Sequence, residues 1–332
     1  MSLRLLQVEL AGHERAVAAL DEDGRAMRLE GSVSTYELAS EALARGSSLE
    51  QAARGHMTMA AINIGGASDA VRLLPPIDHP DPAHLFLTGT GLTHLGSAAS
   101  RDRMHALAAA PGAQTDSMRM FLEGLQGGKP PPGGIGAQPE WFYKGDGSSI
   151  VPTGAPLEMP GFALDAGEEP EIAGIYLIDP RGLPVRLGFC LANEFSDHAM
   201  ERHNYLWLAH SKLRQAALGA ELRLGELPAD VRGTSRIYRG ESLIWQKPFL
   251  TGETNMSHTI ANLEHHHFKY PGFRRPGDVH VHFFGTATLS FAEQVRCEPG
   301  DLFDISADAF VLPLRNRLAR SGAQALGPVR AL

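Results

Sequence analysis

The segment Glu168-Glu169-Pro170-Glu171-Ile172-Ala173-Gly174-Ile175-Tyr176-Leu177 combines a pair of carboxylates with a run of apolar residues. Its apolar residues predict a strand over Glu171–Ile178. Residues two apart on a strand share a face, so the carboxylates of Glu169 and Glu171 project together. Two carboxylates that close repel each other unless a proton or a cation lies between them. On spacing alone, a metal site and a solvated strand edge both remain open.

A second predicted strand supplies a third carboxylate. Residues Pro184–Ala192 are mainly apolar and are followed by Asn193-Glu194-Phe195-Ser196, which places Glu194 where a strand gives way to a helix. Three carboxylates together with water form an oxygen-rich site, which suits Mg²⁺ or Mn²⁺ better than zinc. We therefore predict that Glu169, Glu171 and Glu194 bind one divalent cation, with Mg²⁺ the first choice and Mn²⁺ the alternative.

Short strands separated by turns are expected in most of the chain, which predicts an α+β fold that is mostly β. The proline-rich residues 73–82 form the expected linker between a small N-terminal α/β domain (1–75) and a catalytic domain (76–332). Glycines and prolines at 126–138 predict a loop. The other strands are expected at Leu3–Leu10, Arg15–Leu20, Leu85–Leu87, Glu221–Leu224, Glu241–Lys247, Asp278–Phe284 and Leu302–Ile305, and the helices at Thr35–Arg45, Phe195–Ala217 and Thr259–Phe268.

The bulk composition narrows the class of protein. A chain of 332 residues with a formal net charge of −8 and no basic stripe argues against a nucleic-acid partner. No apolar run reaches the 18 residues or so that a membrane-spanning helix needs, so no membrane partner is expected. Two cysteines exclude a disulfide framework. We expect a cytoplasmic enzyme.

Several further segments occur in an order that resembles the fumarylacetoacetate hydrolase superfamily, and the resemblance covers roughly residues 80–318. The first is the metal-binding core itself, Glu169-Pro170-Glu171 with Asn193-Glu194. The others are Trp141-Phe142-Tyr143-Lys144-Gly145, His210-Ser211-Lys212-Leu213-Arg214, Glu253-Thr254-Asn255-Met256, Pro276-Gly277-Asp278-Val279, Phe284-Gly285-Thr286-Ala287 and Leu314-Arg315-Asn316.

This resemblance implies the fumarylacetoacetate hydrolase fold, a mixed β-roll or sandwich catalytic domain, and a homodimer. It implies that Lys144 and Lys212 enter the active site, Lys144 as an anchor or proton acceptor. It also implies that Thr254, Gly285 and Thr286 hold the substrate's carboxylate end. The family's third metal ligand is usually Asp, whereas Glu194 here is one methylene longer.

One expected family feature is absent. Members that hydrolyse C–C bonds carry a histidine after a glycine-rich turn, and here that position is Ser97, which we assign to substrate binding. Serine is no general base near neutral pH without an activator. The resemblance therefore points to the branch that dehydrates 2-keto-3-deoxy sugar acids, acting on a D-xylonate- or D-arabinonate-derived 2-keto-3-deoxy-pentonate to give 2,5-dioxopentanoate. His94, beside the same turn, is a candidate acid or base.

Three alternatives stay open. The first is hydrolysis of an acylpyruvate or 2,4-diketo acid on the same fold. The second is a sugar-acid-binding protein without turnover. The third is a histidine-centred metal site, since His280 and His282 are two apart on a predicted strand. The consecutive His265, His266 and His267 lie on a predicted helix and cannot all face one metal.

Overall fold

The computed structural model describes residues 2–64, 71–96, 115–322 and 327–332. Within these residues the strands form a 13-stranded and a 5-stranded sheet. The helices are α1 (Thr35–Arg45), α2 (Leu49–His56), α4 (Asp116–Gly127), α5 (His198–His203), α6 (Leu208–Lys212) and α7 (Ile260–Phe268). The strands are β1 (Arg4–Leu10), β2 (Arg15–Leu20), β3 (Ala26–Leu29), β4 (Met57–Ile62), β5 (Val71–Leu73), β6 (Leu85–Gly89), β7 (Phe142–Asp146), β8 (Ile150–Pro152), β9 (Leu157–Met159), β10 (Pro170–Ile178), β11 (Pro184–Asn193), β12 (Ala216–Leu218), β13 (Glu221–Arg223), β14 (Val231–Arg239), β15 (Ser242–Thr251), β16 (Val279–Phe283), β17 (Leu302–Ala307) and β18 (Leu314–Arg320).

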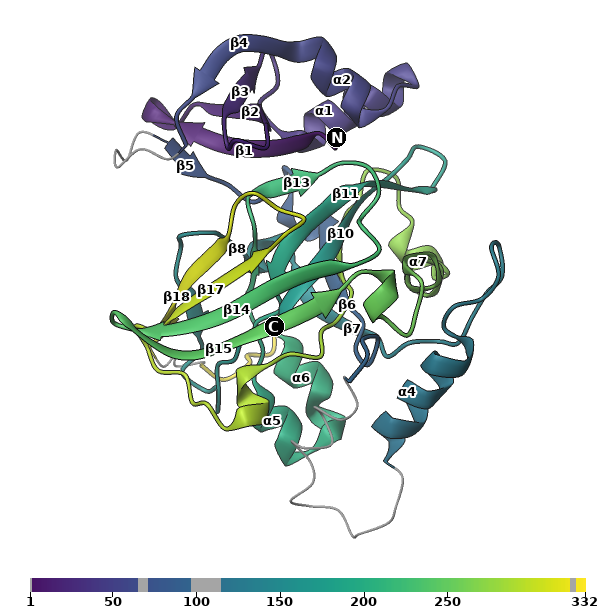
Figure 1. The fold of residues 1–332 in the computed structure, drawn as a ribbon, viewed down its shortest axis with the longest axis vertical. Helices are drawn as coiled ribbons and strands as arrows, with labels where there is room; N and C mark the ends of the chain where they lie inside the picture. Colours follow the sequence, from purple (N-terminus) through teal and green to yellow (C-terminus); the bar gives the residue numbers. More distant parts are fainter. Residues whose placement is uncertain (1, 65–70, 97–114, 323–326) are drawn as a thin grey trace.

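The large sheet has β10 and β11 near its centre. Its main order is β4-β3-β2-β1-β13-β11-β10-β16-β6-β7, with β10 antiparallel to both β11 and β16, and β16 parallel to β6. The small sheet, β15-β14-β17-β18-β9, crosses in front of β10 and β11 in Figure 1. The mostly-β fold predicted from the sequence is confirmed.

Both faces are buried along Pro170–Ile178 of β10 and residues 187–193 of β11, which explains why these stretches are mainly apolar rather than alternating. On β11, Phe189 and Leu191 join one core, which also contains Phe249 and Ile305 of the small sheet. Cys190 and Ala192 point to the other core. The strands that carry the glutamates are therefore fixed on two sides.

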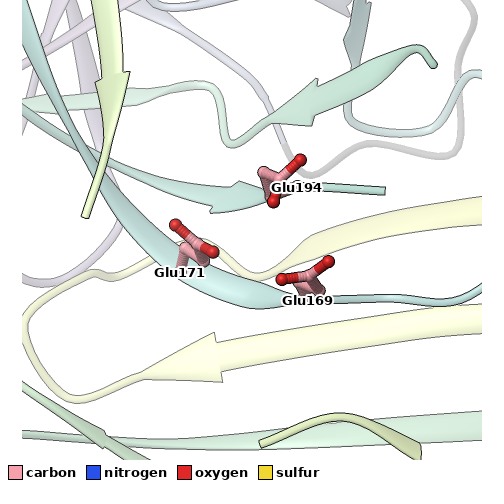
Figure 2. A group of neighbouring side chains, drawn as sticks. All are labelled: Glu169, Glu171 and Glu194. Atoms are coloured by element: carbon pink, nitrogen blue, oxygen red, sulfur yellow. The ribbon is translucent and has the colours of Figure 1, made fainter. Parts of the chain in front are cut away.

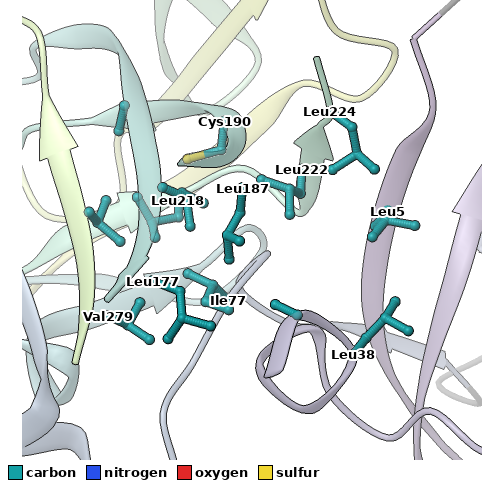
Figure 3. Packing of buried hydrophobic residues seen from close by; sticks show 14 of the residues in the cluster. Leu5, Leu38, Ile77, Leu177, Leu187, Cys190, Leu218, Leu222, Leu224 and Val279 are labelled. Atoms are coloured by element: carbon teal, nitrogen blue, oxygen red, sulfur yellow. The ribbon is translucent and has the colours of Figure 1, made fainter. Parts of the chain in front are cut away.

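The N-terminal unit continues the large sheet instead of standing apart from it. Strand β1 pairs with β13, with Leu5 opposite Leu222. One hydrophobic core contains Leu5 and Leu38 of this unit together with Leu177 and Leu222 (Figure 3). The described part of residues 1–75, which the sequence predicts as a separate domain, thus shares a sheet and a core with later strands.

Local signals explain where helices begin and end. Helix α1 occupies the predicted residues; the Ser34 side chain accepts a hydrogen bond from the Glu37 amide and Gly46 ends it in the left-handed conformation. Helix α2 was not predicted, although Ser48 and Gln51 form a capping box. Helix α4 and strands β14 and β18 were also missed, and α4 takes the first two residues of the predicted loop at 126–138.

The predicted helix Phe195–Ala217 is wrong. It is three short pieces, namely α5, a 3₁₀ turn at Tyr205–Trp207 and α6, followed by strand β12. Asn204 breaks the helix because its backbone is extended (φ −156°, ψ 119°) and its side chain accepts from the Leu206 amide. This break lets the chain fold back so that α5 and α6 lie side by side (Figure 1). Among the described helices, none has the length and apolar character required to cross a membrane.

Candidate functional site

Strand pairing brings the three predicted metal ligands together. Glu169 directly precedes β10, Glu171 is the second residue of β10, and Glu194 directly follows β11, whose last residue Asn193 pairs with Pro170. The Glu194 amide donates to the Glu169 carbonyl at 3.0 Å, and the Asn193 side chain accepts from the Glu169 amide at 3.1 Å. One oxygen from each of the three carboxylates lies within 4.8 Å of the others (Figure 2).

These carboxylates are buried and repel one another. Their residues are only 8%, 1% and 0% exposed, for Glu169, Glu171 and Glu194 respectively. Burial and then the charges of Glu194 and Glu169 hold the pKa of Glu171 well above its usual value. Burial and the charge of Glu169 likewise raise the pKa of Glu194. Such a group is stable as three anions only when cations compensate it, so the three side chains fit a divalent metal ion.

In this structure Lys212 supplies part of that compensation. Its Nζ donates to Glu169 Oε1 at 2.5 Å, to Glu194 Oε2 at 2.7 Å and to Ser196 Oγ at 3.2 Å. Burial would lower the pKa of Lys212, but the two carboxylates outweigh it and the pKa is raised. Lys212 is therefore an ammonium that bridges two of the expected metal ligands.

Lys144 contacts Glu194 but is not among the residues that line the cavity around the three glutamates. Its Nζ contacts Glu194 Oε1 at 2.9 Å and donates to the carbonyl oxygens of Phe195 at 2.6 Å and Lys212 at 3.1 Å. Burial lowers its pKa despite the attraction of Glu194. All of its contacts are to protein groups that carry the site, so its position suits an anchor for Glu194 rather than a proton acceptor at the substrate.

Gly285 and Thr286 also line this cavity. The Gly285 amide donates to Glu171 Oε2 at 2.7 Å, and Thr286 follows it in the lining. The cavity is lined by Thr90, Gly91, Leu92, Phe142, Glu169, Glu171, Glu194, His198, Glu201, Lys212, Gly285, Thr286 and Leu289. Six residues predicted from the sequence, Glu169, Glu171, Glu194, Lys212, Gly285 and Thr286, therefore meet in one place.

Replacing Gly285 by Ala is expected to destabilise the protein by about 2–4 kcal/mol, because backbone strain and overpacking add. Gly285 has φ +96°, and a Cβ would lie 2.4 Å from Thr93 Oγ1 and 2.8 Å from the Thr90 carbonyl oxygen. Gly300 is the matched control, since it has φ +99° but no atom within 4 Å of a Cβ. Urea denaturation of both variants separates the two costs; equal losses of unfolding free energy would show that the close packing around Gly285 is unimportant.

The sequence missed two lining residues, His198 and Glu201, on α5. They are three apart and both buried, so they share the face of the helix that closes the cavity. His198 Nε2 lies 3.1 Å from Glu169 Oε1, and Nδ1 lies 3.6 Å from Asp165 Oδ2. The sequence does contain a signal for them, because Asp197 can cap a helix that begins at His198, which places His198 and Glu201 one turn apart. The prediction of one long helix from Phe195 to Ala217 hid this start.

His198 gives the metal-free protein a pH-dependent stability. Burial lowers its pKa, but the hydrogen bonds and charges of Asp165 and Glu169 outweigh burial and raise the pKa from 6.5 to about 10. A raised folded pKa adds stability below pH 6.5 that is lost as the pH rises through 10. With EDTA present, His198→Gln should therefore lose at least about 2 kcal/mol of unfolding free energy at pH 6 and less at pH 10. Urea titrations at both pH values would refute this if the loss were the same.

The other predicted site residues lie elsewhere. His94 is buried between Thr93 and Thr251, 2.8 Å from the Thr251 hydroxyl, and burial with the nearby His258 lowers its pKa to about 3. Thr254 is exposed on the 3₁₀ turn Glu253–Asn255. Neither lines the cavity, so the structure does not support a catalytic role for His94 or a substrate contact for Thr254. Ser97 lies outside the described residues.

The histidine pair on β16 packs inside the protein. His267 Nε2 lies 3.0 Å from His280 Nδ1, and the rings of His267 and His282 stack with centroids 4.5 Å apart. Burial lowers the pKa of His280 and of His282 to about 3 in each case. Within the described residues only the three glutamates form a group of His, Cys, Asp or Glu with metal-binding spacing, so the histidine-centred alternative is not supported.

Comparison with known proteins gives the fold. No protein-family model matches the sequence, and no curated protein matches it. Among solved structures, 2-keto-3-deoxy-D-arabinonate dehydratase in its apo form matches with a TM-score of 0.68 and 17% identity, over 96% of this chain and 99% of that chain. The same enzyme complexed with magnesium and 2,5-dioxopentanoate matches at 0.68 and 16%, with the same coverage.

A further match is 5-carboxymethyl-2-hydroxymuconate delta-isomerase from Mycobacterium smegmatis, with a TM-score of 0.58 and 16% identity, over 96% of this chain and 99% of that chain. These likenesses extend over nearly the whole chain. They confirm the fumarylacetoacetate hydrolase fold expected from the sequence motifs.

Proposed function

We propose that this chain is a Mg²⁺-dependent hydro-lyase that removes water from a 2-keto-3-deoxy-pentonate to give 2,5-dioxopentanoate. The observation that carries the proposal is the buried group of Glu169, Glu171 and Glu194 with the Lys212 amine in one small cavity. The structural similarity to a dehydratase that binds magnesium and 2,5-dioxopentanoate supports it.

The metal and the protein have separate tasks in this proposal. Mg²⁺ held by Glu169, Glu171 and Glu194 would supply Lewis-acid polarisation of a 2-oxo acid. Lys144 keeps Glu194 in place through its contact at 2.9 Å. Gly285 orients Glu171 through its amide, and the hydroxyl of Thr286, the next residue in the lining, would donate to the substrate's carboxylate end. This positioning lowers the entropy cost of reaction.

Lys212 is the proton carrier that the geometry favours. With the charge of Glu169 and Glu194 neutralised, the interactions that raise its pKa weaken, whereas its burial continues to lower it. The neutral amine then accepts the C3 proton. The electron pair of that C–H bond forms the C3–C4 double bond as the C4–O bond breaks, and the ammonium protonates the departing hydroxyl to release water. A C5 proton is then transferred to C3, and the resulting enol becomes the C5 aldehyde.

The direct test uses protein stripped with EDTA and supplied with Mg²⁺ and 2-keto-3-deoxy-D-arabinonate or 2-keto-3-deoxy-D-xylonate. We expect loss of one water and formation of 2,5-dioxopentanoate, detected by mass spectrometry, and no product without added metal. Pyruvate and a second acid formed from an acylpyruvate would instead establish a C–C hydrolase. Metal-dependent binding of the sugar acids without any product would establish a binding protein.

A further inference from the structure

The helix α5 places a carboxylate, Glu201, in the cavity wall where the proposed chemistry gives it no task. Glu201 is 1% exposed, lines the cavity and lies one turn from His198. Its charge acts on Lys212, whose pKa it helps to raise. Glu169 directly precedes β10, Glu171 lies on β10 and Glu194 directly follows β11, so Glu201 on α5 is contributed by a different element.

The positive charges in the cavity are already engaged. Among the described lining residues, Lys212 and His198 are the cationic side chains, and both contact Glu169 Oε1, at 2.5 and 3.1 Å. No arginine is among those lining residues. A ligand with a second carboxylate would therefore bring an additional negative charge next to Glu201 without a cation of its own.

A ligand whose far end carries a hydroxyl group would instead be attracted to Glu201. A carboxylate accepts hydrogen bonds from hydroxyl donors, and charge-assisted bonds of this kind are stronger than neutral ones. It repels another carboxylate, and in a buried site this repulsion is much larger than in water. One side chain can therefore favour a hydroxylated tail and reject an acidic one.

We propose that Glu201 is a specificity-determining residue, which selects 2-oxo acids whose far end carries hydroxyl groups and rejects those whose far end carries a second carboxylate. This inference rests on the proposed function, because it takes the 2-oxo acid end to lie at Glu169, Glu171 and Glu194. The expected substrates of this site are therefore monocarboxylic, polyhydroxylated 2-oxo acids, and dicarboxylic 2-oxo acids are expected to bind weakly.

A matched pair of unreactive ligands tests the inference. 5-Hydroxy-2-oxopentanoate and 2-oxoglutarate share five carbons and the 2-oxo acid end, and differ at the far end in hydroxyl against carboxylate. Neither carries a 4-hydroxyl to eliminate. Dissociation constants for both, and for pyruvate as a ligand without a tail, are measured by calorimetry with saturating Mg²⁺. The proteins are the unmodified chain, Glu201→Gln, Glu201→Ser, Glu201→Asp, and Glu241→Gln, which removes an exposed carboxylate from the turn between β14 and β15.

In the unmodified protein and in Glu241→Gln we expect 2-oxoglutarate to bind at least about tenfold more weakly than 5-hydroxy-2-oxopentanoate, since one like-charge contact in a partly buried site is of that size or larger. Glu201→Gln and Glu201→Ser should bring the two constants within about twofold to threefold of each other, mainly through tighter binding of 2-oxoglutarate. Glu201→Asp, which keeps the charge, should keep the discrimination. Mg²⁺ and pyruvate affinities should not change.

Three results would overturn the inference, each on different grounds. If pyruvate binds with Mg²⁺ but the discrimination is the same in Glu201→Gln and Glu201→Ser as in the unmodified protein, Glu201 does not set specificity and the proposed function is untouched. If Mg²⁺ affinity falls in both neutral variants, Glu201 belongs to the metal site instead. If no 2-oxo acid binds to the unmodified protein with Mg²⁺, the proposed function fails and this inference fails with it.

Discussion

Glutamine in place of Glu171 is expected to weaken Mg²⁺ binding by more than about 100-fold and to lower kcat/KM by roughly 10³-fold or more, because a ligand and its negative charge are both lost. The amide is nearly the same size as the carboxylate, and its oxygen can still accept the hydrogen bond from the Gly285 amide, which is 2.7 Å long in the unmodified protein. The loss should therefore be one of charge and ligation rather than of folding.

The same substitution should stabilise the metal-free protein at alkaline pH. The pKa of Glu171 is raised well above 4.5 by burial and by Glu194 and Glu169. A carboxyl group whose folded pKa is raised takes stability away as the pH climbs above 4.5, because the folded state must then hold an unfavourable charge. Glutamine removes that penalty.

Calorimetric Mg²⁺ titration and urea denaturation in EDTA at pH 8 measure both effects of Glu171→Gln. Glu241→Gln, which removes an exposed carboxylate, is the control and should change neither. If the variant bound Mg²⁺ like the unmodified protein, or were less stable than it in EDTA, the three-glutamate site would be incorrect.

The metal ligands could be predicted because they depend on local pattern. Glu169 and Glu171 are two residues apart, and the pleat of a strand places such residues on the same face. The apolar run that follows them is typical of a buried strand, which indicates that this face lies inside the protein. Glu194 could be placed because it directly follows the second apolar run. The antiparallel pairing of β10 with β11, which sets Pro170 opposite Asn193, was then enough to bring the three together.

The part of the cavity wall that α5 and α6 form together could not be placed from the sequence, because its position depends on where one predicted helix breaks. A continuous helix from Phe195 to Ala217 would carry Lys212 far from Glu194, since 18 helical residues span about 27 Å. Asn204 interrupts that helix and returns Lys212 to within 2.7 Å of Glu194. The same break also ends the short helix α5, which carries His198 and Glu201.

Long-range packing also decided the positions of residues whose sequence motifs suggested a direct role. Lys144 was expected to be an anchor or a proton acceptor in the active site, and its amine is held against Glu194 and the carbonyl oxygens of Phe195 and Lys212, which suits the anchor. His94 was expected to act as an acid or base, but it is enclosed beside the Thr251 hydroxyl. In both cases the partner groups lie far away in the sequence, so no local pattern could reveal them.

Methionine in place of Lys212 is expected to destabilise the metal-free protein by about 3–5 kcal/mol, because it leaves buried carboxylates without their cation. Methionine keeps an unbranched stem but has no ammonium, so Glu169 and Glu194 lose the contacts at 2.5 and 2.7 Å. If these oxygens also hold Mg²⁺, the metal must substitute for the missing charge. The rise in Tm caused by Mg²⁺ should then be larger in Lys212→Met than in the unmodified protein, although activity is lost with the proton carrier.

Thermal melts of Lys212→Met with EDTA and with Mg²⁺ give that comparison, and Lys129→Met, which alters an exposed lysine, is the control. A variant that Mg²⁺ stabilised no more than the unmodified protein would mean that lysine and metal do not share the same carboxylates. A variant that kept full turnover would remove Lys212 from the proton transfer while leaving the metal site intact. The two readouts therefore test separately the two tasks that one buried amine is proposed to perform, namely charge compensation before the metal binds and proton transfer afterwards.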